Sequence, residues 1–125
     1  MKITSFDPVI VTPDAEAAIK VFTDLGFQRT HSPVTSLVQG DVHSFRMENE
    51  NGFHVDVVSP ADERPRDEML IRMNVDDYDE ACAILTAHGF KNVHADNRTV
   101  DTKSSKSVTM VSPSGFRIAI VNHKK

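Results

Sequence analysis

Asn49-Glu50-Asn51-Gly52-Phe53 in the middle of the chain and Ser112-Pro113-Ser114-Gly115-Phe116 near its end carry a Gly-Phe pair at positions 63 residues apart. The same offset of 63 residues relates Gly26-Phe27 to Gly89-Phe90, and Asp14 to Asp77. Because this offset does not drift over half of the chain, the sequence predicts one supersecondary unit that is used twice.

The first repeat, residues 1–60, is predicted to have the order β-α-β-β-β. A strand over 3–12 leads into a helix that begins at Thr12-Pro13-Asp14, with Thr12 as the capping residue and proline at the first helical position. A buried stripe of Ala18, Val21, Phe22 and Leu25 follows at helical spacing, and Gly26 ends the helix. Strands over 27–31, 41–48 and 53–59 complete the repeat, the last two joined by a glycine-containing turn at 49–52.

The second repeat, residues 69–125, follows a proline- and charge-rich linker over 61–68. It has a strand over 69–75, then a helix capped by Asp77. The predicted helix stripe consists of Tyr78, Ala81, Ile84, Leu85 and His88. Strands are expected over 91–95, 107–111 and 116–121. The polar stretch 96–106 between them is either a lid or an ordinary disordered loop.

Composition restricts the classes of partner. The 125 residues carry a formal net charge of −4 and no basic stripe, which argues against nucleic acid or an anionic membrane as partner. No segment is apolar for long enough to span a bilayer. The single cysteine, Cys82, allows no intramolecular disulfide and suits a reducing compartment, so we expect a cytoplasmic protein in which Cys82 is a small buried hydrophobe.

Three groups of motifs occur together and in register: Val11-Thr12-Pro13-Asp14 with Leu25-Gly26-Phe27, Asn74-Val75-Asp76-Asp77 with Gly89-Phe90, and Ser112-Pro113-Ser114-Gly115-Phe116-Arg117-Ile118. With these motifs, nearly the whole chain resembles the vicinal oxygen chelate superfamily, which includes glyoxalase I, ring-cleaving dioxygenases, fosfomycin-resistance enzymes and bleomycin-resistance proteins. The resemblance implies an α+β fold in which two tandem βαβββ units form a curved mixed sheet, or cup, with helices on its outer face. Ligand sites in this family often form at a homodimer boundary, so a homodimer is expected.

The resemblance also implies where a metal site would lie. Metal-using members place one ligand early in the first strand of each unit, commonly histidine, and one midway along the last strand, commonly glutamate. The corresponding positions here hold Asp7, Leu70, Asp56 and Ala119. Leucine and alanine side chains cannot bind a cation, so half of the usual set is missing and we expect no metal cofactor.

Strand alternation indicates which side chains line the cup. Val55 and Val57 fall on one face of their strand, with His54 and Asp56 on the other. Asp7, His54 and Asp56 are therefore expected on one wall, and Arg72 and Arg117 on the other. The arginines could bind a carboxylate or phosphate through forked hydrogen bonds, or the acids and arginines could simply pair and close the cup.

His54 allows three interpretations. It could bind an ion with Asp7 and Asp56, act as a general base oriented by Asp56, or be a structural or solvated histidine, which is the favoured interpretation. The sequence contains no nucleophile motif, phosphate-binding glycine loop or zinc spacing.

The leading hypothesis is a metal-free small-molecule-binding protein of the bleomycin-resistance type, with a polar or anionic ligand. The alternatives are a metal-dependent lyase, isomerase or dioxygenase-like enzyme with an atypical Asp7/His54/Asp56 site, and a ligand-free dimeric scaffold. Fold does not decide among them.

Overall fold

The computed structural model describes residues 1–37, 40–61 and 63–124, and the chain forms two compact units. The N-terminal module comprises Asp7–Met69, and the C-terminal module combines Met1–Phe6 with Leu70–Lys125. The first residues belong to the C-terminal module through backbone contacts, such as the Asp76 amide that donates to the Lys2 carbonyl at 3.1 Å. Position 62 of the predicted linker lies outside the described residues.

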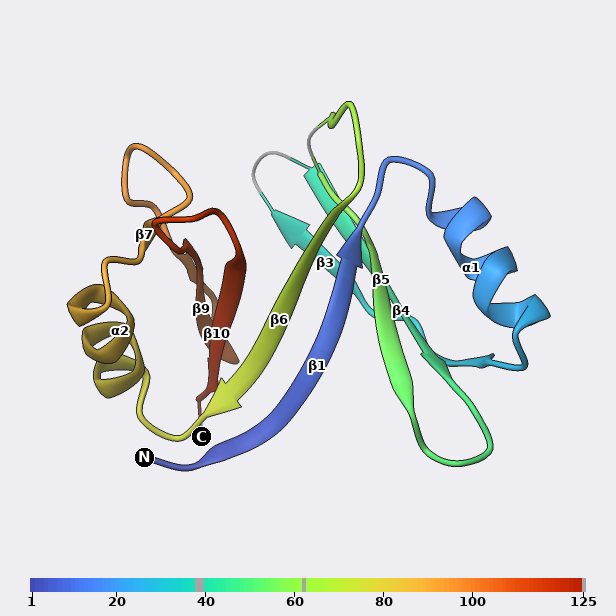
Figure 1. Ribbon diagram of the computed structural model, residues 1–125, viewed down its shortest axis with the longest axis horizontal. Coiled ribbons are helices and arrows are strands. Elements are labelled where there is room, and N and C mark those ends of the chain that lie inside the picture. The colour runs from blue at the N-terminus through green and yellow to red at the C-terminus, as the bar shows by residue number, and fades with distance from the viewer. Residues whose placement is uncertain (38–39, 62, 125) are drawn as a thin grey trace. The chain divides into compact units, whose positions relative to one another are not determined.

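The N-terminal module is a sheet with α1 (Ala15–Asp24) on one face (Figure 1). Its strands lie in the order β2-β4-β5-β1, and β3 pairs with β4. β1 and β5 are parallel, whereas the other pairs are antiparallel. The strands are β2 (Gln28–His31), β3 (Val34–Leu37), β4 (Gly40–Glu48) and β5 (His54–Ser59), together with β1 (Ile3–Val11), of which residues 3–6 belong to the C-terminal module.

The C-terminal module repeats this arrangement with α2 (Tyr78–Ala87) beside its sheet (Figure 1). Its strands lie in the order β6-β10-β9-β7 with β8 paired to β9, and β6 and β10 are parallel. The strands are β6 (Glu68–Val75), β7 (Lys91–Asn92), β8 (Val100–Asp101), β9 (Ser105–Val111) and β10 (Arg117–His123). The predicted α+β fold of two βαβββ units with mixed strand directions is confirmed, with β3 and β8 as additional short strands.

The residues that alternation assigned to the core do face the helices. Val55 and Val57 pack with Met47 against α1, and Val57 is fully buried. Ile118 and Ile120 occupy the corresponding positions in the core under α2. Burying an aliphatic side chain of this size stabilises a fold by about 1.5–3 kcal/mol, so the cores hold each helix on one side of its sheet.

Both helices begin at an aspartate, which corrects one expectation. Asp77 Oδ1 accepts a hydrogen bond from the Glu80 amide at 3.0 Å, as predicted for α2. In α1 the cap is Asp14, which accepts from the Ala17 amide at 3.1 Å, and not Thr12. The Thr12 hydroxyl instead accepts from the Asp14 amide at 3.0 Å, so it orders the chain just before the helix.

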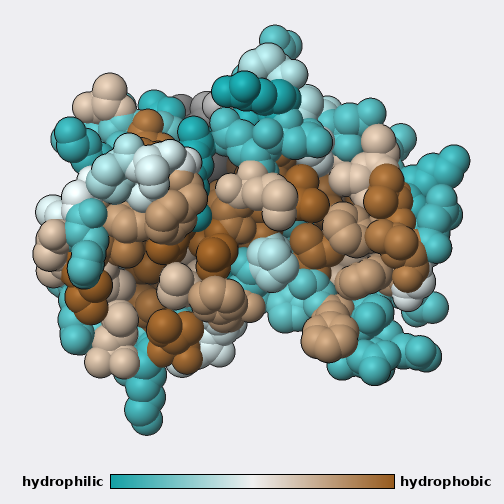
Figure 2. Space-filling model, in the orientation of Figure 1, coloured by the Kyte–Doolittle hydropathy of each residue, from teal (hydrophilic) through white to brown (hydrophobic). Residues whose placement is uncertain are grey.

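The buried stripes differ from the predicted ones by a shift around the helix. In α1, Val21 and Leu25 are 55% and 67% exposed, and Leu25 lies beyond the last turn of the helix. The core-facing residues are Ala15, Ala18, Ile19 and Phe22. In α2 the side chain of Ile84 is exposed and Cys82 packs toward the core instead. Figure 2 shows the hydrophobic surface that this leaves along α1.

The two hairpin turns use equivalent hydrogen bonds. Asn49 Oδ1 accepts from the Phe53 amide at 3.0 Å, and Ser112 Oγ accepts from the Phe116 amide at 3.1 Å. Gly52 has φ +84°, the left-handed region in which glycine is favoured, as the sequence predicted. These turns determine which residues of the flanking strands lie opposite one another.

The segment 91–106, which follows α2, differs from the prediction at both ends. Its first strand is shorter than predicted, and its predicted loop contains a short strand. The strand predicted over 91–95 is limited to Lys91–Asn92, and Val100–Asp101 within the predicted loop pairs with β9 as β8. Thr102 Oγ1 accepts from the Ser105 amide at 3.1 Å and closes the turn between β8 and β9. Among the described residues, neither helix has the length and apolar character that a membrane span requires.

Candidate functional site

The face of the N-terminal sheet opposite α1 carries a cluster of charged side chains. Strand register aligns Asp56 with Val9 on β1 and with Arg46 on β4. Because alternate residues of a strand share a face, Asp7 and His54 lie on the same side as Asp56 and Arg46. The structure therefore brings together three residues predicted from the sequence, Asp7, His54 and Asp56, and adds Arg46. These four residues are called the Arg46 cluster below.

Arg46 donates two hydrogen bonds to the carboxylate of Asp56 and one to the carboxylate of Asp7. Its Nε donates to Asp56 Oδ1 at 3.0 Å, and its Nη2 donates to Asp56 Oδ2 at 3.2 Å. The same Nη2 donates to Asp7 Oδ2 at 3.1 Å. A planar guanidinium suits this arrangement, since its N–H groups match the two oxygens of a carboxylate.

His54 completes the cluster through the other oxygen of Asp7. Its Nε2 lies 2.7 Å from Asp7 Oδ1, which is hydrogen-bond distance. Asp7 thus contacts the imidazole on one side and the guanidinium on the other. With both carboxylates ionised, Arg46 offsets one negative charge, and a protonated His54 would offset the second.

Burial makes the pairing of these charges necessary. Asp7 and Asp56 are only 2% and 3% exposed, whereas the side chains of Arg46 and His54 retain 36% and 25% exposure. A buried carboxylate without a cation or donors costs several kcal/mol. The hydrogen bond to Asp56, followed by the charges of Asp56 and Asp7, raises the pKa of Arg46 above its usual value, although burial acts in the opposite direction.

The side chains at the family's metal positions do not fit a metal ion. Arg46 Nη2 bridges Asp7 Oδ2 and Asp56 Oδ2, so it occupies the space in which an ion shared by these oxygens would bind. The equivalent positions of the C-terminal module hold Leu70 and Ala119, which have no donor atoms. Across residues 1–37, 40–61 and 63–124, no three His, Cys, Asp or Glu side chains are arranged to hold a metal.

The two predicted arginines lie on the C-terminal sheet. Ala119 on β10 aligns with Arg72 on β6, and Arg117 lies two residues before Ala119. Arg72 and Arg117 therefore share the face opposite the core residues Ile118 and Ile120. Both side chains are half-buried, and both take part in interactions within the structure.

Arg46 is the cluster residue that the sequence interpretation missed. Its signal lies in the hairpin of β4 and β5, because counting outward from the turn at Asn49–Phe53 places Arg46 opposite Asp56. Alternation along β4 would then have assigned Arg46 to the polar face, between the core residues Phe45 and Met47.

Two βαβββ modules, each with a helix on one face and polar residues on the other, define the class of two-module glyoxalase-like folds. A family model described as the Glyoxalase/Bleomycin resistance protein/Dioxygenase superfamily matches residues 4–120, and the chain belongs to this superfamily. The family expected from the sequence motifs is thereby confirmed. No curated protein sequence matches the chain.

Solved structures share the fold at low sequence identity. Glyoxalase I from Zea mays matches with a TM-score of 0.68 and 14% identity over 97% of this chain, which spans only 43% of the maize chain. A protein from Staphylococcus aureus matches with a TM-score of 0.66 and 11% identity, covering 99% of this chain and 100% of that one. A superfamily member from Vibrio splendidus matches with a TM-score of 0.62 and 12% identity over 97% and 99% of the two chains.

Proposed function

We propose that this member of the superfamily is a metal-free small-molecule-binding protein whose ligand is polar or anionic. The observation that supports it is the position of Arg46, whose guanidinium bridges the two carboxylates left at the family's metal positions. A divalent cation would have to displace this guanidinium and would be repelled by it, while finding no donor at Leu70 or Ala119.

The ligand-contacting residues that we propose lie on the sheet faces opposite the helices. In the C-terminal module these are Arg72 and Arg117, whose guanidinium groups suit a carboxylate or phosphate. Since both arginines already interact within the protein, an anion would share or replace those contacts. In the N-terminal module we propose His54 as the contact residue, held by Asp7 next to the Arg46–Asp56 pair.

The metal-free part of the proposal is tested by metal content. Purified protein is exposed to nickel, zinc, manganese, cobalt and iron(II), desalted and analysed for bound metal. We expect near-zero retention of every ion. Retention of about one ion per chain would overturn the metal-free proposal, and a metal-dependent enzyme would then be the better description.

The anion-binding part is tested with inorganic phosphate and citrate as probes in calorimetric titrations. Loss of a charge-assisted hydrogen bond costs about 1.5–3 kcal/mol, so Arg72→Ala or Arg117→Ala should weaken binding about tenfold or more. Arg66→Ala, which removes an exposed arginine from the linker, is the matched control. If both sheet variants bind the probes as well as the control does, these arginines do not form the site.

A further inference from the structure

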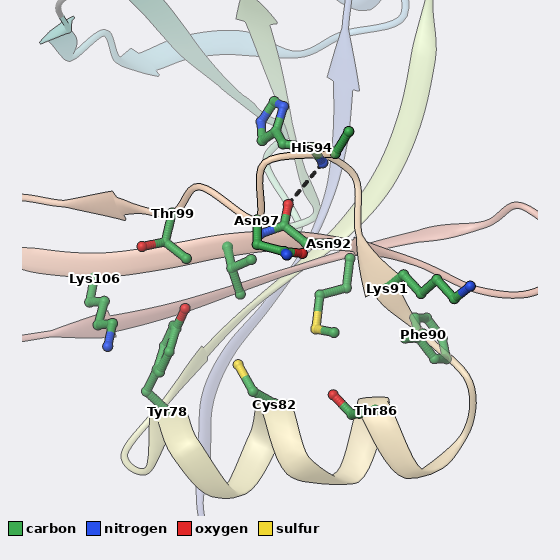
Figure 3. Close-up of a pocket in the computed structure, with 13 residues that line it drawn as sticks. Tyr78, Cys82, Thr86, Phe90, Lys91, Asn92, His94, Asn97, Thr99 and Lys106 are labelled. Carbon is green, nitrogen blue, oxygen red and sulfur yellow. Dashed lines mark hydrogen bonds between the residues drawn. The ribbon is translucent and has the colours of Figure 1, made fainter.

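The C-terminal module contains a pocket of about 610 Å³ between α2 and the strands β7 and β9 (Figure 3). Tyr78, Cys82 and Thr86 project into it from α2. Val108 and Met110 line it from β9. The volume lies within the range of about 300–1,000 Å³ that is typical of small-molecule sites. The pocket is on the helix side of the sheet, which is opposite to the face that carries Arg72 and Arg117.

A comparison of the two modules explains why this space is not filled. Phe45 on β4 aligns with Val57, and 63 residues later Val108 on β9 aligns with Ile120. Ile19 on α1 likewise corresponds to Cys82 on α2. In the N-terminal module Ile19 and Phe45 pack into the core. The C-terminal module has the smaller Cys82 and Val108 at these positions, which leaves a hollow where its counterpart is packed.

Aromatic side chains limit the hollow along α2. Tyr78 lies in the first turn of α2, where the N-terminal module has Ala15. Phe90 lies just beyond the other end of the helix and contacts Phe116 edge-to-face, with ring centroids 5.3 Å apart. The space between them is lined by Cys82, Val108 and Met110, which offer an apolar surface.

Lys106 places an ammonium group on the pocket wall beside Tyr78, and the carboxylates of Asp79 and Asp101, whose charges also act on Tyr78, lie outside the lining. Lys106 Nζ lies 4.6 Å from the centroid of the Tyr78 ring, and none of the described residues that line the pocket is acidic. The cross-strand neighbour of Lys106 is Asp101, whose carboxylate accepts a hydrogen bond from Lys124 Nζ. Within the described part of the chain, the Lys106 ammonium makes no hydrogen bond or salt bridge.

We propose that this pocket binds a small amphipathic organic anion. Its apolar body lies against Cys82, Val108 and Met110, and its carboxylate, sulfonate or similar group binds Lys106. Apolar burial supplies most of the affinity, and the ammonium selects the charge. The site is independent of the one proposed above for Arg72 and Arg117, because the two occupy opposite faces of the same sheet.

The test uses 8-anilinonaphthalene-1-sulfonate as the anionic probe and N-phenyl-1-naphthylamine as its uncharged analogue. Lys106→Gln should weaken binding of the sulfonate about tenfold or more, as expected for one charge-assisted contact, and should leave the uncharged probe unaffected. Lys103→Gln removes the same charge from an exposed position of the neighbouring turn and is the matched control. Equal effects of the two lysine variants on the sulfonate would overturn the role of Lys106.

The space itself is tested by filling it as the N-terminal module does. Val108→Phe, and separately Cys82→Ile, should abolish binding of both probes while circular dichroism and the unfolding midpoint remain native. Two variants are used because either one alone could disturb the fold. Undiminished binding by whichever variant is folded would show that the probes bind elsewhere.

Cys82 provides an internal reporter because it is the only cysteine of the chain and lines the pocket. Its reaction with the uncharged reagent 4,4′-dithiodipyridine is followed with and without saturating sulfonate probe. Bound probe should slow the reaction at least severalfold in the wild-type protein, and also in Arg72→Ala and Arg117→Ala. An unchanged rate at saturation would place the probe outside the pocket and refute the proposal.

Discussion

Replacing Arg46 with methionine is the most direct test of how the charged cluster is held together. The change removes three hydrogen bonds of 3.0–3.2 Å and leaves Asp7 and Asp56 without their guanidinium partner. Methionine retains most of the apolar volume of the arginine stem, so the loss of charge is the main perturbation.

The expected magnitude follows from burial. Breaking a buried ion pair by removing one partner costs about 3–5 kcal/mol, because the remaining charge is uncompensated. Arg46 is itself 36% exposed and both carboxylates have further interactions, so water and those contacts reduce the penalty. We therefore expect about 3 kcal/mol, which for a chain of 125 residues lowers the unfolding midpoint by about 10 °C.

The penalty should be recovered when the carboxylates are neutralised together with the guanidinium. Arg46→Met/Asp7→Asn/Asp56→Asn, which removes all three charges, should recover most of the loss at neutral pH.

Urea unfolding at neutral pH, followed by circular dichroism, measures these differences. Arg29→Met is the matched control, because Arg29 lies over the Phe45 ring at 5.0 Å and such a contact contributes only about 0.5–1 kcal/mol at an exposed position. Differences of up to about 0.5 kcal/mol between variants lie within the usual deviation from additivity. The reasoning is refuted if the free energies of unfolding of Arg46→Met and Arg29→Met differ by no more than this. A triple variant that is no more stable than Arg46→Met would also refute it.

Three further predictions concern stability. Gly89→Ala should destabilise the fold by more than Gly26→Ala in thermal melts. Both glycines have positive φ, which costs a substituted alanine about 1–2 kcal/mol, but a Cβ at Gly89 would also lie 2.9 Å from Pro113 Cγ, whereas a Cβ at Gly26 would meet open space. Equal losses of stability would contradict a role for the Pro113 contact. Burial, with a smaller contribution from Cys82, raises the pKa of Tyr78 to about 12. The neutral Tyr78 side chain therefore contributes fully to folding stability below about pH 10, and this contribution is lost as pH rises through about 12. Because Tyr78 is the only tyrosine of the chain, absorbance at alkaline pH measures its titration directly, and a titration midpoint near the usual value for tyrosine would contradict the prediction. Tyr78→Phe should remove the loss of stability at alkaline pH. Asp77→Ala should lower the free energy of unfolding by about 1 kcal/mol through loss of the α2 cap, whereas Asp77→Asn should retain most of the stability that the cap contributes.

The fold was predictable because its signals are local and occur twice. Gly52 and Asp77 adopt the predicted turn and cap geometry, and period-two alternation correctly assigned Val55 and Val57 to the core. The helix stripes were less certain, since Ala18 and Phe22 belong equally to two neighbouring stripes and only packing against the sheet distinguishes them. β3 and β8 have weak local signals and form because a neighbouring strand supplies hydrogen-bond partners.

The candidate site was only partly predictable because it depends on register between strands. Alternation placed His54 and Asp56 on one face, but it could not say which residue of another strand lies opposite them. The Arg46–Asp56 contact requires the pairing of β4 with β5, and the Arg46–Asp7 contact also requires the parallel pairing of β1 with β5. The pocket beside α2 was missed for a different reason, since a cavity is visible only when Val108 is compared with the larger Phe45 of the other module.

The two proposed binding sites can be separated because they use opposite faces of one sheet. Arg72 aligns with Ala119 on one side of the β6–β10 pair, whereas Val108 aligns with Ile120 and packs with the core on the helix side. Arg72→Ala should therefore weaken phosphate binding without changing the affinity for the naphthalene sulfonate, and Val108→Phe should do the reverse. If either variant weakened the binding of both phosphate and the naphthalene sulfonate while its unfolding midpoint stayed native, the two probes would share one site. The assignment of the ligands to separate faces of the sheet would then be wrong.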